Sequence, residues 1–190
     1  MNNPALKVYT GWKPYLKLRE MATVLSRAEI KRLLAAKPPL VEEWVDLEQQ
    51  LQPNGIDLTL REVALLQSAG AITMDNSQRQ ISELAPLVFD GLGYIDLAAG
   101  IYLITYNEIV HLPENITALG APRSSLLRCG ADIKTAVWDA GYSGRSQSLL
   151  VVYNSQGIRL QRNARILQLI FFRLTQKTRG YRGKYQGENV

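Results

Sequence analysis

The sequence predicts a mainly β domain, built as a β-sandwich, a jelly roll or a closed barrel, with a short helical segment in front of it. Three observations support this prediction: the strand-like runs are short, Gly, Asn or Pro bounds them, and turn signals recur at close intervals. Branched and aromatic residues fill the runs, as is typical of strands. The runs lie at 56–60, 100–106, 148–153, 158–160 and 165–174, and 154–157 indicates a tight turn.

The helical segment begins at Ser26, ahead of the first predicted strand. Ser26 and Glu29 have the spacing of a capping box, in which each side chain accepts a hydrogen bond from the other residue's backbone N–H. Apolar residues then recur on one helical face, namely Ile30, Leu33 and Leu34. Pro38 and Pro39 end the helix, because a proline disfavours helical geometry in the residue before it.

The composition is ordinary for a globular protein and argues against a membrane protein. With 190 residues, 46% of them hydrophobic and 21% charged, the chain is long enough for one domain with a real core. No apolar stretch reaches the ~20 residues of a membrane span, and the first ten residues lack the apolar core of a secretory signal. We therefore expect no membrane partner.

The chain has one cysteine, Cys129, and one histidine, His111, and these counts exclude two enzyme classes. A zinc-dependent nucleoside deaminase needs three His or Cys ligands, which the chain cannot supply. A Ser-His-Asp hydrolase would have to use His111, and the sequence lacks the G-x-S-x-G elbow. A lone cysteine cannot form an intrachain disulfide, so we expect a cytoplasmic location.

The net charge is +5, and the basic residues are denser after Ala121. Such a balance suits an acidic small molecule or nucleic acid, or merely aids solubility. The end of the chain, 177–190, combines glycine with cations, which indicates either a solvated terminus or a lid that orders over an anion. An RNA-binding tail rests on composition alone, and we expect no nucleic-acid partner. We divide the chain into an N-terminal arm (1–22), a β domain (23–176) and a closing tail (177–190).

The segment 120–128 is a candidate phosphate site. Its Pro-Arg-Ser-Ser start and following apolar run indicate a loop that enters a short helix. The free N–H groups of a helix N-terminus attract phosphate, and the hydroxyls of Ser124 and Ser125 add donors. Arg123 and Arg128 can add charge-assisted hydrogen bonds. A serine cap flanked by surface arginines is the alternative.

Asp139 is the candidate catalytic residue. It follows an apolar run, 135–138, which we interpret as a strand, and it precedes a glycine-containing turn. A carboxylate beside a triphosphate can accept a proton from water, and Tyr142 can pack on a sugar face. An Asp-led hairpin turn without a ligand is the alternative.

Two more polar residues lie on predicted strands. Asp57 begins a strand after the turn at 52–55, where it either presents a carboxylate or caps the turn. Gln168 interrupts an apolar run, so its amide needs a hydrogen-bond partner, either a phosphate oxygen or a backbone group.

Taken in order, these four segments resemble the signature blocks of the trimeric dUTPase and dCTP deaminase superfamily, and the tail resembles its fifth block. The resemblance extends from about Val24 to the end of the chain, and 24–30 and 51–58 look closer to the dCTP deaminase branch than to short dUTPases. The specific parts are Pro-Arg-Ser-Ser-Leu at 122–126, Asp-Ala-Gly-Tyr at 139–142 and Lys-Tyr-Gln-Gly at 184–187.

The resemblance implies a distorted jelly-roll or β-clip barrel that forms a homotrimer, with active sites between the subunits. It implies Asp139 as the general base that activates water, and Mg²⁺ as a cofactor that Asp57 contacts through water. It also implies that Tyr142 packs on deoxyribose and that Tyr185, or its competitor Tyr181, stacks on the base. The substrate-binding residues implied are Arg123, Ser124, Ser125, Leu126, Arg128, Tyr142, Gln168, Lys184, Tyr185 and Gln186.

One absence separates the two chemistries of this superfamily. Deaminases carry a catalytic glutamate on the strand after the turn, and the corresponding residue here is Val151, which cannot transfer protons. No Asp or Glu lies between Gly141 and Gln168, so a shifted register supplies none. We therefore predict a dUTP pyrophosphatase that contacts uracil through the backbone from Leu149 to Val151. A dCTP deaminase, a bifunctional enzyme and a non-catalytic nucleotide sensor are the alternatives.

Overall fold

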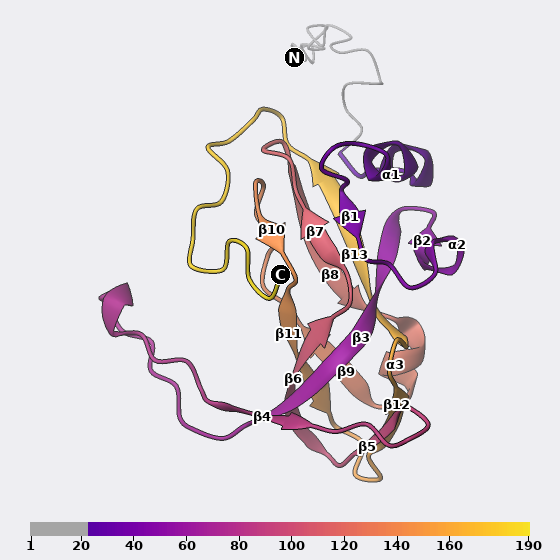
Figure 1. The fold of residues 1–190 in the computed structure, drawn as a ribbon, viewed down its shortest axis with the longest axis vertical. Helices are drawn as coiled ribbons and strands as arrows, with labels where there is room; N and C mark the ends of the chain where they lie inside the picture. The colour runs from indigo at the N-terminus through magenta and orange to yellow at the C-terminus, as the bar shows by residue number, and fades with distance from the viewer. Residues whose placement is uncertain (1–22) are drawn as a thin grey trace, which may run out of the picture.

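Figure 1 shows the computed structural model of the chain, which describes residues 23–190; the predicted arm at 1–22 lies outside these residues. The short helical elements are α1 (Arg27–Leu34), α2 (Leu47–Gln50), the 3-10 turn η2 (Asn76–Gln78) and α3 (Ser124–Arg128). The strands are β1 (Val41–Glu42), β2 (Leu51–Gln52), β3 (Gly55–Leu66), β4 (Leu84–Leu87), β5 (Tyr94–Leu97), β6 (Gly100–Tyr106), β7 (Ile109–His111), β8 (Ile116–Pro122), β9 (Ala131–Lys134), β10 (Ser143–Gly144), β11 (Gln147–Val152), β12 (Ile158–Gln161) and β13 (Arg165–Arg173). The predicted mainly β fold with a short N-terminal helix is confirmed.

The strands form one large sheet and two small ones. The large sheet has the order β8-β13-β3-β6-β11-β9, with β2 and β4 paired to β3, and it curls into a nearly closed barrel. A second sheet has the order β1-β7-β10, and β12 pairs with β5. Within the described part of the chain, no helix is long and apolar enough to cross a membrane.

The local signals at the start and end of the elements are confirmed. Ser26 and Glu29 form the capping box of α1, with the Glu29 carboxylate 3.2 Å from the Ser26 backbone nitrogen. α1 ends at Leu34, before the two prolines. The turn after β11 is closed by a hydrogen bond from the Gly157 N–H to the Asn154 carbonyl at 2.8 Å, and Gly157 has a φ of +77°.

Strand β3 is more deeply buried than its alternating sequence indicates. Both Asp57 and Thr59 are only 1% exposed, although alternation is typical of a half-buried strand. Each finds polar partners inside the protein: Asp57 pairs with arginines, and Thr59 bonds to the buried carboxylate of Glu108 through its N–H at 2.8 Å and its hydroxyl at 2.6 Å. Polar residues are therefore buried in this strand because each has a polar partner inside the protein.

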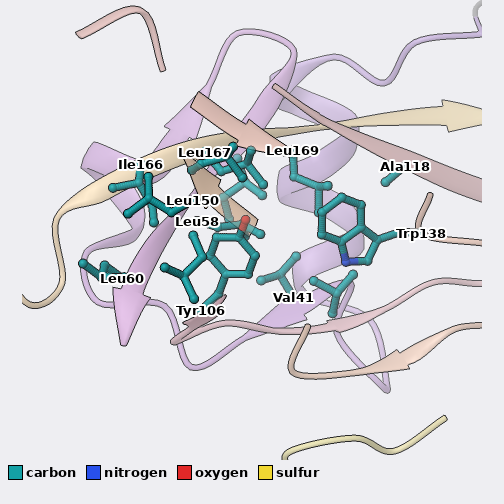
Figure 2. Packing of buried hydrophobic residues seen from close by; sticks show 14 of the residues in the cluster. Val41, Leu58, Leu60, Tyr106, Ala118, Trp138, Leu150, Ile166, Leu167 and Leu169 are labelled. Carbon is teal, nitrogen blue, oxygen red and sulfur yellow. The ribbon is translucent and has the colours of Figure 1, made fainter. Parts of the chain in front are cut away.

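The segment before Asp139 corrects the sequence prediction. The run 135–138 is not a strand; β9 ends at Lys134, and Trp138 alone forms a bridge with Ala118 of β8. Trp138 is buried, and its indole N–H donates to Ser146 Oγ at 3.0 Å, so a tertiary contact rather than a ladder fixes this residue. Figure 2 shows Trp138 at one side of the core, whose other labelled members come from β1, β3, β6, β8, β11 and β13.

Candidate active site

Asp139 begins a tight turn that leads into β10. The Tyr142 N–H donates to the Asp139 carbonyl at 3.0 Å, and Gly141 has a φ of +86° at the third position of the turn. A positive φ at that position is the requirement of a type II turn, which glycine meets without strain. The turn leaves the Asp139 side chain exposed, while Trp138 and Tyr142 on either side are buried. A fixed turn thus presents an accessible carboxylate.

A cavity of about 280 Å³ opens beside this turn. Its wall combines four aromatic side chains with two carboxylates: Trp138, Tyr142, Tyr181, Tyr185, Asp139 and Glu188. The ring centroids of Tyr142 and Tyr181 are 5.9 Å apart in an edge-on arrangement. Apolar walls with a few polar groups are typical of small-molecule sites.

The C-terminal tail forms the outer wall of the cavity. In Figure 1 the tail, in yellow, leaves β13 and returns beside β7 and β10. The Tyr181 N–H donates to the Ala140 carbonyl at 2.7 Å, which fixes the tail on the turn. Gln186 lies over the same turn, because its side-chain amide accepts from the Ser143 N–H at 3.1 Å and donates to the Gly141 carbonyl at 3.1 Å.

Tyr142 and Glu188 meet inside the cavity. The Tyr142 hydroxyl donates to Glu188 Oε1 at 2.8 Å. Burial raises the pKa of Tyr142 far above its usual range, and the hydrogen bond and charge of Glu188 add to this effect. Burial also raises the pKa of Glu188, although the hydrogen bond from Tyr142 opposes that rise. Tyr142 therefore stays a neutral donor, held in place by a carboxylate that the sequence analysis left without a role.

A second polar cluster surrounds Asp57 on β3. Arg123 Nε lies 3.0 Å from Asp57 Oδ2, and Arg165 Nη1 lies 3.5 Å from the same oxygen. Burial raises the pKa of Asp57, and the two arginines act against that rise. Gln168 of β13 pairs with Asp57 across the sheet, so two predicted site residues are neighbours here. Gly55 makes this possible, since a Cβ there would lie 2.5 Å from a backbone oxygen of β13 and 3.0 Å from Gln168 Nε2.

The predicted phosphate block continues this cluster through α3. Ser124, Ser125 and Arg128 are exposed, whereas Leu126 is buried and anchors the helix. Arg123 is the N-cap residue and makes no side-chain capping bond. Its guanidinium is directed instead toward Asp57 and the Arg165 carbonyl, the latter at 3.3 Å. Ser124 and Ser125 are exposed, so their hydroxyls are accessible to a ligand.

Asp139, at the cavity, and Arg123, in the predicted phosphate block, lie far apart on one chain. Trp138 pairs with Ala118, and Thr117 Oγ1 donates to the Trp138 carbonyl at 2.8 Å, so Asp139 lies beside Thr117. Arg123 follows β8 at its other end, six residues from Thr117. At about 3.3 Å per residue, the separation along the strand is roughly 20 Å. Figure 1 agrees, because α3 and β10 lie on opposite sides of the barrel.

Of the remaining predicted residues, the two tail tyrosines line the cavity and Leu149, Val151 and Lys184 do not. Leu149 and Val151 share one face of β11 with Gln147, which lines the cavity, and both are half-buried. Leu149 and Val151 themselves do not line the cavity. Lys184 is exposed on the tail. Tyr181 and Tyr185 both line the cavity, and Tyr185 is the more exposed, at 38%.

Two residues that hold this site were missed by the sequence analysis. Arg145 is 5% exposed; it forms an ion pair with Glu43 at 2.6 Å and donates to the Asn189 carbonyl at 3.0 Å. His111 bridges Ser143 Oγ at 2.7 Å and Glu42 at 2.8 Å, linking the three strands of the small sheet. The partners of each lie far away in the sequence, and no local motif signals them.

The chain is similar to known proteins over most of its length. Residues 24–174 match the family model described as dCTP deaminase-like. A probable deoxyuridine 5'-triphosphate nucleotidohydrolase of Methanosarcina mazei is 53% identical over 168 residues, covering 88% of this chain and 98% of that protein. One of the same name from Archaeoglobus fulgidus is 50% identical over 167 residues, with 88% and 98% covered.

A solved structure shares the fold. The crystal structure of 2'-deoxycytidine 5'-triphosphate deaminase from Agrobacterium tumefaciens superposes with a TM-score of 0.61 at 21% identity, over 80% of this chain and 48% of that one. The family match covers most of the chain, and the relatives match it almost from end to end. The chain therefore belongs to the dCTP deaminase-like family.

Proposed function

We propose that the protein is a dUTP pyrophosphatase, which converts dUTP and water to dUMP and diphosphate. The observation that carries the proposal is the composition of β11, the second strand after the Asp139 turn. Every side chain of β11 from Gln147 to Val152 is an amide, a hydroxyl or a hydrocarbon, so this strand offers no acid for ring chemistry. The relatives that are about half identical carry the name of this activity.

In the proposed mechanism Asp139 holds a water molecule and takes its proton while the oxygen attacks the α-phosphorus. Diphosphate leaves in line with the attack. Tyr142 packs on the deoxyribose in the aromatic cavity, and Leu149–Val151 offers backbone groups to uracil. Arg123, Ser124, Ser125, Arg128 and Gln168 stabilise the phosphate charge. We infer that the tail, 177–190, acts as the lid, with Lys184, Tyr185 and Gln186 over the substrate.

The residues present suit a metal ion that the triphosphate itself carries. Among residues 23–190, no cluster of three His, Cys, Asp or Glu side chains forms a metal cage. Asp57 Oδ2 already contacts Arg123, Arg165 and Gln52, so we infer that Asp57 would meet an ion through water rather than bind it directly. We propose Mg²⁺ at this place, because it keeps several waters and favours phosphate oxygens. When bound, it would supply positive charge to the phosphate oxygens.

We also propose that each active site lies between two subunits of a homotrimer. A general base and the groups on the leaving diphosphate must approach one phosphorus within a few ångström. On one chain Asp139 and Arg123 are separated by roughly 20 Å along β8. A neighbouring copy can bring its arginine block, Arg123 and Arg128, to the Asp139 cavity. We expect the enzyme to act in the cytoplasm, because its one cysteine is free and exposed.

The decisive experiment replaces Asp139 with Asn and measures diphosphate release from dUTP, dCTP, dTTP and UTP. Loss of the base should lower kcat for dUTP by about 10²- to 10⁴-fold, with binding of a non-hydrolysable analogue retained. Asp96→Asn is the control, because Asp96 lies on β5 and pairs with Arg159 at the surface. Tight dUTP binding without turnover in the wild-type protein would favour a sensor, and ammonia release from dCTP would favour a deaminase.

Subunit mixing tests the shared site. Asp139→Asn and Arg128→Ala subunits should each be inactive alone, because each lacks one half of every site. After equal mixing and reassembly, about one quarter of the sites should combine an intact half from each kind of subunit. Recovery of activity to about that fraction supports a site between subunits. A mixture that stays inactive after exchange is demonstrated would contradict it.

A further inference from the structure

The tail carries a second carboxylate into the cavity of Asp139. Glu188 lines the cavity together with Tyr142, Tyr181 and Tyr185. Its Oε1 accepts the Tyr142 hydroxyl at 2.8 Å. Within residues 23–190, its Oε2 has neither a hydrogen bond nor an ion pair. One oxygen is thus fixed, and the other is available to a ligand.

The backbone holds Glu188 firmly at this place. The Arg145 N–H donates to the Glu188 carbonyl at 2.9 Å, and the Glu188 N–H donates to the Tyr185 carbonyl at 3.3 Å. The tail lies so close to β10 that a Cβ on Gly144 would come within 3.2 Å of the Glu188 nitrogen. These contacts fix the backbone of Glu188, and the hydrogen bond from the Tyr142 hydroxyl holds its carboxylate.

The chemistry of a carboxylate limits what Glu188 can bind. An ionised carboxylate only accepts hydrogen bonds, and it repels phosphate oxygens of like charge. With Asp139 in the same cavity, this end of the site disfavours the β- and γ-phosphates, which the arginine block holds, while Asp139 faces the α-phosphate through the attacking water. The nucleoside half offers two donors, the ring N3–H of uracil and the 3′-hydroxyl of deoxyribose.

We propose that Glu188 is a specificity-determining residue, which accepts a hydrogen bond from an N–H or O–H donor on the nucleoside half of the substrate. This inference rests on the proposed function. It gives the tail a second role besides closing the active site, because Glu188 of the tail also contacts the nucleoside and discriminates between nucleosides. If the donor is N3–H, Glu188 also distinguishes uracil from cytosine, whose N3 presents a lone pair and would face the carboxylate unfavourably.

The test measures the binding of α,β-imido analogues, which cannot be hydrolysed, by wild-type protein and by Glu188→Gln. The substitution keeps an acceptor for Tyr142 and replaces the free carboxylate oxygen with an N–H donor. The ligands are the dUTP analogue, its 3′-deoxy form and the dCTP analogue. Glu83→Gln is the matched control, because Glu83 is exposed ahead of β4. Hydrogen exchange at the Tyr181 and Gly187 amides checks that the tail stays docked.

Loss of a charge-assisted hydrogen bond should raise the Kd of the dUTP analogue by about 10-fold or more in Glu188→Gln. If N3–H is the donor, the dCTP analogue should bind the variant as tightly as the wild type or tighter. If the 3′-hydroxyl is the donor, the penalty should disappear with the 3′-deoxy analogue. Equal weakening of all three analogues, or a change below about twofold for the first, would overturn the proposal. Because no turnover is measured, wild-type protein that binds the analogue but releases no diphosphate from dUTP would refute only the proposed function.

Discussion

Replacing Gly141 with Ala should separate the tail from the turn that carries Asp139. Gly141 has a φ of +86°, where a side chain costs about 1–2 kcal/mol. A Cβ built there would lie 2.6 Å from Gly180 Cα and 2.8 Å from the Tyr181 nitrogen. Both are backbone atoms, so no side-chain rotation relieves the contact. The tail must retreat by about 0.8 Å to reach the ordinary distance of 3.4 Å.

This retreat should break the hydrogen bond from the Tyr181 N–H to the Ala140 carbonyl, which is 2.7 Å long. We expect faster hydrogen exchange at the Tyr181 amide and kcat/KM for dUTP lowered by about 10- to 100-fold, because the lid no longer completes the site. The melting temperature should fall by only a few degrees, at about 2–4 °C for each kcal/mol in a chain of this size. Gly91→Ala is the control, since no atom lies within 4 Å of its Cβ position. Full activity with an undisturbed Tyr181 amide would refute this reasoning.

The remaining predictions concern buried charges. Glu108→Ala leaves the Gln50 amide and the Thr59 N–H without their carboxylate partner. Each buried unsatisfied group costs about 1–3 kcal/mol, so the free energy of unfolding measured in urea should fall by about 2–6 kcal/mol. A loss below about 1 kcal/mol would contradict this reasoning. Burial raises the pKa of Glu108, so the folded state holds its proton more firmly than the unfolded state. Wild-type stability should therefore fall as pH rises from the usual glutamate range through the raised pKa, and Glu108→Gln should flatten that part of the pH profile. Arg145→Met removes a donor to the Asn189 carbonyl, so exchange at the last three amides should accelerate; unchanged exchange would exclude Arg145 as their anchor.

Local signals predicted much of the fold, and contacts between distant residues account for the rest. The capping box at Ser26 and the turn at Gly157 act over four residues or fewer, so the sequence displays each complete motif. The turn at Asp139 is local too. By contrast, the Tyr142 hydroxyl bonds to a residue 46 positions away, and Glu108 bonds to Gln50 at a separation of 58. Pairings of this kind have no spacing rule that a single sequence reveals.

The error before Asp139 has the same origin. An apolar run that ends in a tryptophan is typical of a strand, and the rule counts residues without asking what the indole N–H needs. The partner of that N–H is Ser146, eight residues further on and across the turn. The buried ring keeps its N–H hydrogen-bonded, and this places Trp138 where it forms a single bridge with Ala118. The residues before Trp138 are not part of the sheet. A side-chain requirement thus overrides the backbone pattern directly beside Asp139, the proposed general base.

The docking of the tail follows from the geometry of β10. One edge of the turn and strand is bonded to β7, through the Leu112 N–H to the Tyr142 carbonyl at 2.8 Å. The other edge would expose the Ser143 carbonyl and the Arg145 N–H, and the tail pairs with both, through the Gly187 N–H at 2.8 Å and the Glu188 carbonyl at 2.9 Å. An unpaired strand edge binds an extended segment because the backbone groups of the edge need hydrogen-bond partners. The tail therefore docks through hydrogen bonds within the protein itself, and in its proposed role as a lid it sets bonds with which an entering or leaving nucleotide must compete.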